Sequence, residues 1–208
     1  MLPRAIFYTV TVGVALAILF ISILRSASVN YSFSQPPPAP GSMPSSEIEV
    51  IYKLANPGKV LPDSPFWTLK AVRDQVWLLI SPSYARKAEL SLLFADKRLV
   101  AAKLLFEKGE HELGYITLMK GEGYLLDAFQ FADSAKLGGM DMSAGLTRIA
   151  TSALKHRQVV EEILEIAPED ARPEIIKTQD ISKNVYKMAR DELYEMGRPV
   201  PKSPFEGD

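Results

Sequence analysis

The sequence of 208 residues has no cysteine, only two histidines and two tryptophans, and no marked excess of either charge. The absence of cysteine excludes disulfides, thiolate metal sites, thiol nucleophiles and the lipid-modified cysteine of a bacterial lipoprotein. The 24 lysines and arginines nearly balance the 25 aspartates and glutamates. The chain therefore lacks the overall basic character that is typical of proteins that bind nucleic acid, and we expect no nucleic-acid partner.

The longest uncharged apolar run covers residues 5–24, AIFYTVTVGVALAILFISIL. As an α-helix it would be about 30 Å long, which matches the hydrocarbon core of a bilayer. A cleaved signal peptide is the alternative, but its apolar core is usually about 7–15 residues long. In addition, Arg25 stands among the small residues that would form the cleavage site. We therefore expect residues 5–24 to be an uncleaved transmembrane signal anchor in the lipid bilayer.

The positive charges around this run indicate its orientation. Arg4 precedes it, Arg25 follows it, and no further lysine or arginine occurs before Lys53. Because positive residues concentrate on the cytoplasmic side of a membrane, this distribution slightly favours a cytoplasmic stub at residues 1–4. The prediction is a single-pass protein of the cytoplasmic membrane whose C-terminal domain is extracytoplasmic.

Residues 25–59 are predicted to be a proline-rich stalk or linker. Residues 26–46 carry no charge and include the run QPPPAPG at 35–41. This composition is typical of a semi-rigid, polyproline-like spacer. A proline-rich docking motif for a partner is the alternative, but no lysine or arginine flanks the run to give it a direction. We expect a stalk that holds a domain away from the membrane.

Residues 60–196 are predicted to form a helical bundle, organised around the stretch 83–109. Six apolar residues recur there at spacings of three and four, the pattern of a helix packed lengthwise against other helices: Ala88, Leu92, Ala95, Leu99, Ala102 and Phe106. The charged residues between them, which include Asp96 and Arg98, predict a side that faces water.

Further helices are predicted on both sides of this stretch. The first runs from Pro65 to about Ile80, with Asp63 or Ser64 as its cap. The others cover about 110–136, 142–167 and 168–196, and Pro173 interrupts or bends the last. After 196, residues 197–208 are predicted to be a disordered tail. The expected fold is all-α: one N-terminal transmembrane helix and an extracytoplasmic four- or five-helix antiparallel bundle.

Two glycines, Gly121 and Gly123, lie inside the helix predicted over 110–136. Each costs about 1 kcal/mol relative to alanine in a helix interior. The helix is therefore expected to bend there or to cross a neighbouring helix closely. A phosphate-binding loop is less favoured, because neither a preceding strand nor a following Lys-Ser/Thr pair is present.

The helix that starts near Pro65 has an apolar stripe formed by Phe66, Leu69, Val72, Val76 and Leu79, with Trp67 and Trp77 beside it. Phe66, Trp67 and Trp77 are the candidates for contact with a partner or for packing. Trp67 could stack on a ligand such as a sugar ring. Packing is the favoured interpretation, because an aromatic residue beside a helix start usually packs against the fold.

No pattern of catalytic or metal-binding residues is present. His111 lies between Glu110 and Glu112, but neighbouring side chains on a helix point about 100° apart and cannot converge on one metal. His156 lies between two cationic residues, which disfavours cation binding, so both histidines are expected to be structural or solvated. Glu161 and Glu165 share a helix face and could weakly hold calcium, although a solvated face is favoured. We expect no cofactor, no metal and no enzymatic activity.

The stretch LPDSPFWTLK at 61–70, followed by RKAEL at 86–90 and FADKRL at 94–99, resembles a bacterial family of membrane-anchored or secreted helical domains of unknown function. Its members open with a Leu-Pro-(Asp or Gly)-Ser-Pro motif. The resemblance continues through ALKHR at 153–157 to Pro168 and beyond. It implies an extracytoplasmic helical domain and brings no catalytic residues. The resemblance also implies that a cytoplasmic regulatory segment can precede the anchor; we expect the stub at residues 1–4 to be too short for one.

Together these features predict a membrane-tethered binding or scaffold module that engages another envelope protein through a helix face. Such a module would leave a contiguous apolar patch exposed on the folded domain. The alternative is an envelope sensor or carrier that binds a small ligand or metal inside the bundle. That function would require a buried pocket with convergent polar groups.

Overall fold

The structure is a computed structural model that describes residues 50–205. Every regular element in this range is an α-helix, which confirms the all-α prediction. No helix in this range is long and apolar enough to span a bilayer. The predicted anchor at 5–24 and most of the predicted stalk lie outside the described residues.

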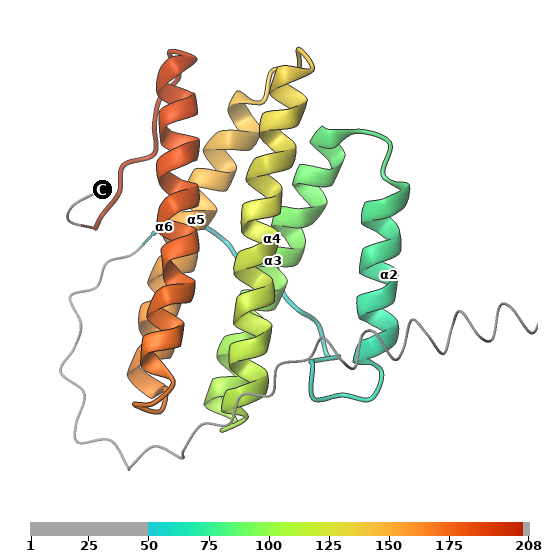
Figure 1. Ribbon diagram of the computed structural model, residues 1–208, viewed down its shortest axis with the longest axis vertical. Helices are drawn as coiled ribbons and strands as arrows, with labels where there is room; N and C mark the ends of the chain where they lie inside the picture. Colours follow the sequence, from blue (N-terminus) through green and yellow to red (C-terminus); the bar gives the residue numbers. More distant parts are fainter. Residues whose placement is uncertain (1–49, 206–208) are drawn as a thin grey trace, which may run out of the picture. The chain divides into compact units, whose positions relative to one another are not determined.

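Five helices follow one another in the described chain: α2 (Trp67–Ile80), α3 (Tyr84–Glu107), α4 (His111–Leu137), α5 (Ser143–Ile166) and α6 (Arg172–Glu195). The turns between α3, α4, α5 and α6 alternate between the two ends of the bundle (Figure 1), so these four helices run up and down. The main pairs are α3 with α4 and α5 with α6. Helix α2 lies at the edge, beside α3.

Helix α3 is the central helix of the bundle. The six apolar residues that the sequence places on its packed face are all buried. Asp96 and Arg98 are also buried, at 3% and 4% exposure, so the prediction that they face water is wrong. Because α4, α5 and α2 all contact α3, the side opposite its apolar face is covered as well.

Several helix ends match their local sequence signals. The Ser83 side chain accepts a hydrogen bond from the Arg86 amide at the start of α3, and Gly109 ends that helix with φ +82°. Two boundaries differ from the prediction. Helix α2 begins at Trp67, after Pro65, and α6 begins only at Arg172. Pro173 thus lies in the first turn of α6, where its missing amide hydrogen costs nothing.

Of the two glycines inside α4, Gly121 lies at a close helix crossing, which is one of the two expectations. A Cβ atom placed on Gly121 would lie 3.3 Å from the Leu99 amide nitrogen and 3.3 Å from Arg98 Cβ, both on α3. At Gly123 the same atom would meet nothing within 4 Å. Helix α4 continues through both positions, so the close approach of α3 explains Gly121 but not Gly123.

Residues 197–205 lie against the bundle, although their composition predicts disorder. The Tyr186 hydroxyl donates a hydrogen bond of 2.8 Å to the Pro201 carbonyl. The guanidinium of Arg157 lies over the Phe205 ring, 4.1 Å from its centroid. An aromatic side chain near the C-terminus therefore anchors this segment to α5 and α6. Residues 206–208 lie outside the described residues.

Candidate functional site

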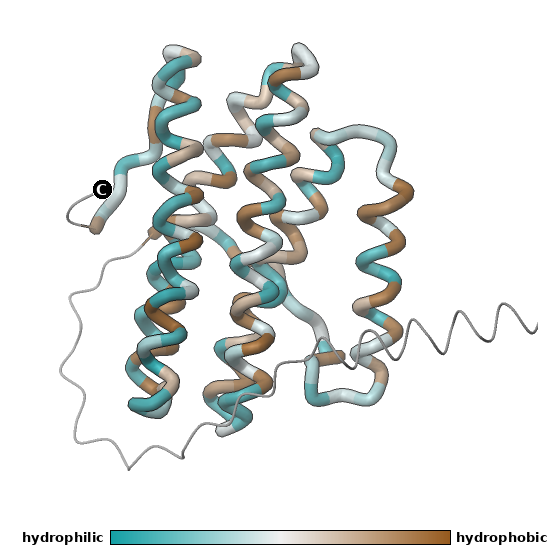
Figure 2. Tube along the Cα trace, in the orientation of Figure 1, coloured by the Kyte–Doolittle hydropathy of each residue, from teal (hydrophilic) through white to brown (hydrophobic). Residues whose placement is uncertain are grey.

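Helix α2 turns its apolar side away from the bundle. Seven large apolar side chains, which we call the apolar face of α2, are between 44% and 80% exposed: Phe66, Leu69, Val72, Val76, Trp77, Leu79 and Ile80. Apolar residues recur along the whole of this helix (Figure 2). Of the three aromatic candidates, Phe66 and Trp77 are thus exposed, and Trp67 is half-buried. The stripe that the sequence predicts exists, but it faces solvent.

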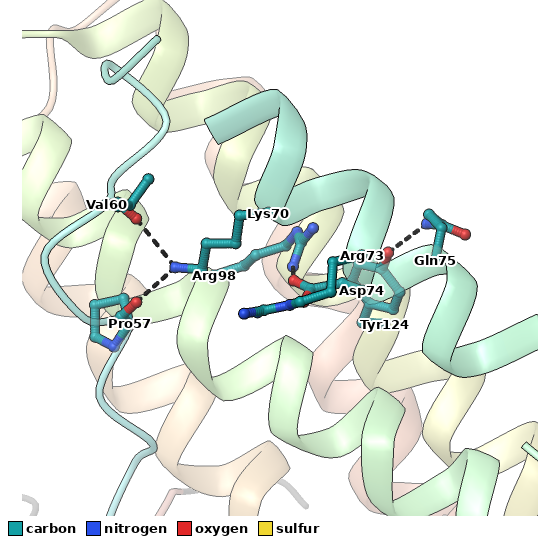
Figure 3. Close-up of polar contacts among 8 residues, drawn as sticks. All are labelled: Pro57, Val60, Lys70, Arg73, Asp74, Gln75, Arg98 and Tyr124. Carbon is teal, nitrogen blue, oxygen red and sulfur yellow. Dashed lines mark hydrogen bonds and ion pairs between the residues drawn. The ribbon is translucent and has the colours of Figure 1, made fainter. Parts of the chain in front are cut away.

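The inner side of α2 carries a buried charge. Asp74 is its only buried residue, with 1% exposure. One carboxylate oxygen of Asp74 accepts a hydrogen bond of 2.7 Å from Arg73 Nη2, and the other lies 3.7 Å from Arg98 Nη1 on α3 (Figure 3). A charged contact therefore lies on this side of the helix, together with Leu78, which packs against the core, and the half-buried Trp67.

Arg98 lies beneath α2 between two aromatic rings. Its guanidinium carbon is 4.6 Å from the centroid of the Tyr124 ring and 5.4 Å from that of Trp67, which places it for cation–π attraction. Its Nε has no hydrogen-bond partner among the described residues. The Tyr124 hydroxyl accepts a hydrogen bond of 2.6 Å from Gln75. A buried cation is thus compensated only in part.

Lys70 connects α2 to the segment that precedes it, residues 50–63, which we call the strap. Its Nζ donates hydrogen bonds to the carbonyls of Pro57, at 2.6 Å, and Val60, at 3.0 Å (Figure 3). Burial lowers the pKa of Lys70; Asp74 opposes this, whereas the positive charges of Lys97, Arg73 and Arg98 lower it further.

A second polar group, which we call the buried cluster, lies in the interior where α3, α4 and α5 meet. His156 Nδ1 is 2.8 Å from Glu122 Oε1, and His156 Nε2 is 3.4 Å from Asp96 Oδ1. The Ser152 hydroxyl donates to Asp96 at 2.8 Å, and the Tyr52 hydroxyl of the strap donates to its other oxygen at 2.9 Å. Asp96 therefore joins the strap to α5.

Charge balance decides the protonation of the buried cluster. Burial by itself lowers the pKa of His156, but the negative charge of Glu122 and hydrogen bonds to Asp96 and Glu122 outweigh it and raise the pKa to about 9. His156 is therefore an imidazolium at neutral pH, with both nitrogens donating. Burial and the charge of Asp96 raise the pKa of Tyr52 to about 12, so its hydroxyl keeps its proton.

The remaining sequence candidates do not converge. His111 is buried beside the Phe106 ring, 5.7 Å between centroids, apart from the buried cluster. Glu161 accepts a hydrogen bond from Gln179, and Glu165 is exposed. Within residues 50–205, no group of three or more histidine and carboxylate side chains is arranged to hold a metal ion.

A hollow of about 410 Å³ lies where α3 begins and α4 ends. It is lined by Pro82, Ser83, Tyr84, Lys87, Ser134, Ala135, Gly138 and Met140. None of these residues belongs to the buried cluster, so the convergent polar groups and the hollow do not form one site.

The sequence matches a family described as a domain of unknown function, DUF5667, over residues 59–170, which is more than half of the chain. The chain belongs to this family. The matched region runs from the strap through α5, so it contains the whole apolar face of α2 and all members of the buried cluster except Tyr52. No curated protein and no solved structure is significantly similar to the chain.

Proposed function

We propose that this DUF5667 protein is a membrane-tethered docking module that engages another protein of the cell envelope through the apolar face of α2. The observation that carries the proposal is the orientation of this helix. Soluble monomers rarely leave a large contiguous apolar patch in water. Here the patch runs along a helix of 14 residues whose only buried residue is Asp74.

The contacts beneath α2 explain why it does not turn its apolar side inward. Rotation about its axis would bury Leu69 or Leu79, but it would also remove Asp74 from Arg98 and Lys70 from the strap. A buried cation left without its partner is strongly unfavourable. The inner contacts therefore hold the apolar side outward, ready for a partner.

The predicted stalk supports a protein partner rather than the bilayer itself. A proline-rich spacer extends by about 3.1 Å per residue, so residues 25–49 would span several tens of ångströms. Such a spacer is suited to hold α2 away from the membrane. A lipid contact would be better served by a short linker.

Cross-linking in cells tests this function. The full-length chain would carry a photoreactive amino acid at Leu69, on the apolar face and 73% exposed, or at Tyr194 on α6, which is 80% exposed. We expect a discrete protein adduct from position 69 only, and its loss when Leu79→Asp is added. Adducts of equal yield from both positions, or adducts to lipid alone, would contradict the proposal.

The proposed location has its own test, which uses the absence of cysteine. Ser45→Cys would be the only thiol in the full-length chain. A membrane-impermeant maleimide should label it in intact cells, after permeabilisation of the outer membrane where there is one. Labelling that requires rupture of the cytoplasmic membrane would place the helical domain inside the cell and overturn the proposed location.

A further inference from the structure

We propose that the protein partner of the apolar face of α2 carries carboxylates around an apolar centre. These carboxylates would complement four cations of this domain, which we call the rim: Lys70, Arg73, Lys97 and Lys120. This inference rests on the function proposed above. It adds the chemical class of the partner, which the apolar face alone does not specify.

The first observation is the uneven distribution of charge along the sequence from residue 50 onward. Residues 50–98 contain eight lysines and arginines but four aspartates and glutamates, whereas residues 99–208 contain 14 and 19. Two of the four acidic residues in the first part, Asp74 and Asp96, and one of its eight cations, Arg98, are buried, which leaves seven cations and two acids. The strap, α2 and the first half of α3 therefore present a cationic surface, although the whole chain is nearly neutral.

The second observation is that cations gather at α2 itself. Lys70 and Arg73 lie on the helix, over the rings of Trp67 and Trp77 respectively. Lys97 and Lys120 come from α3 and α4, and neither forms an ion pair with another described residue. Burial and the nearby charge of Arg98 both lower the pKa of Lys120.

The third observation is the incomplete compensation of Arg98. Its ion pair with Asp74 is long, at 3.7 Å, and the other oxygen of Asp74 is bound at 2.7 Å by Arg73. One carboxylate thus serves two guanidinium groups. The field at this edge of the bundle remains positive, and an approaching carboxylate is attracted both by the rim and by the cation beneath it.

An anionic bilayer has the same charge as an acidic protein surface, but the predicted stalk favours the protein. We therefore infer that the rim binds a protein partner, whose apolar ridge is flanked by aspartate or glutamate. A bilayer contact is a separate outcome of the test below.

The two tryptophans supply the measurement. Both lie on α2, and the chain has no others, so tryptophan fluorescence of the full-length protein in phosphatidylcholine nanodiscs reports on this helix alone. The probes are two designed helical peptides without tryptophan. They share one leucine-rich face, and this face is flanked by glutamates in one peptide and by lysines in the other.

We expect the glutamate peptide to bind about fivefold to tenfold more tightly, because several individually weak rim pairs add up. Added salt should reduce the difference, since exposed charges are screened. The double variant Lys97→Glu/Lys120→Glu should abolish or reverse the preference. The control Lys177→Glu/Lys187→Glu, which changes two exposed lysines of α6, should leave it unchanged.

Equal binding of the two peptides, preference for the lysine peptide or absence of binding to the glutamate peptide would overturn the inference. Strong quenching of both tryptophans by brominated phosphatidylglycerol in the nanodisc would also overturn it, because a bilayer would then cover the face. The proposed function fails separately, when position 69 gives no protein adduct in cells. A protein adduct together with equal peptide affinities would support the proposed function but overturn the inference that the partner is acidic.

Discussion

His156 Nδ1 lies 2.8 Å from Glu122 Oε1, and both side chains are fully buried. The contact joins α5 to α4 across 34 positions of sequence. Together with Asp96, it places one imidazolium between two carboxylates in the interior. Because charges excluded from water must be paired to be tolerated, the protonation of His156 is part of the stability of the bundle.

The first prediction concerns this histidine and pH. The pKa of His156 is about 9 in the folded protein, whereas an unperturbed histidine, as in the unfolded chain, has a pKa of 6.5. Folding therefore favours the protonated form. Its contribution should be fully present below about pH 6.5 and lost as the pH rises through 9. The shift corresponds to at most about 3 kcal/mol. Thermal unfolding of the full-length protein between pH 6 and 9.5 should show this decline.

His156→Gln should be less stable at pH 6 and should flatten this decline, because glutamine does not titrate. His111→Gln is the matched control, since it changes the other histidine of the chain outside the buried cluster. A slope that persists in His156→Gln but disappears in His111→Gln would show that the assignment to His156 is incorrect.

The second prediction concerns the attachment of α2. Asp74→Leu leaves the buried Arg98 without its carboxylate and should weaken the attachment by roughly 1–3 kcal/mol, the cost of an unsatisfied buried polar group. Because α2 lies at the edge of the bundle, the loss should appear as faster amide hydrogen exchange in residues 67–80, with little change in α5 and α6.

Two comparison variants sharpen this test. Asp74→Leu/Arg98→Met removes both charges. Amide hydrogens of residues 67–80 should exchange more slowly in this variant than in Asp74→Leu, since no buried cation is left unpaired. Arg86→Ala breaks an exposed ion pair with Glu89 and should change stability by less than about 0.5 kcal/mol. If Asp74→Leu behaved like Arg86→Ala, the polar side of α2 would not hold the helix in place.

The sequence is sufficient to predict the helices but not all of their orientations. The three-and-four spacing from Ala88 to Phe106 finds the packed face of α3, because that face is apolar along its whole length. It says nothing of the opposite face, where Asp96 is buried by partners from the strap and α5. A charged residue looks the same in a sequence whether water or a buried partner compensates it.

The same limit applies to α2 and to the buried cluster. The apolar stripe of α2 faces outward, while Asp74 on its inner side pairs with Arg98, which lies 24 positions later. This pairing leaves no local pattern in the sequence. His156 and Asp96 are 60 positions apart. One weak local signal exists: Glu122 follows Gly121 in a helix that is otherwise rich in apolar residues, which indicates tight packing beside a carboxylate.

The third prediction concerns the strap. Tyr52→Phe keeps the ring but removes the hydroxyl that donates to Asp96 at 2.9 Å. A hydrogen bond to a charged group is worth about 1.5–3 kcal/mol, so the strap should detach more often. Limited proteolysis and hydrogen exchange of residues 50–60 should both accelerate. Tyr194→Phe, at an exposed position of α6, is the control and should have no effect; equal protection in both variants would contradict the role of Tyr52.

The fourth prediction uses the two glycines of α4 as a matched pair. Gly121→Val places branched atoms where even a Cβ would lie 3.3 Å from the Leu99 amide nitrogen. Because that neighbour is backbone, α3 and α4 must separate, and unfolding should become easier by roughly 1–3 kcal/mol. Gly123→Ala meets nothing within 4 Å and should stabilise the helix by up to about 1 kcal/mol. Denaturant unfolding of both variants separates the two effects. If Gly121→Val were tolerated as well as Gly123→Ala, α3 and α4 would lie farther apart than the 3.3 Å between a Cβ at Gly121 and the Leu99 amide nitrogen implies. Arg98 would then be less tightly confined beneath α2.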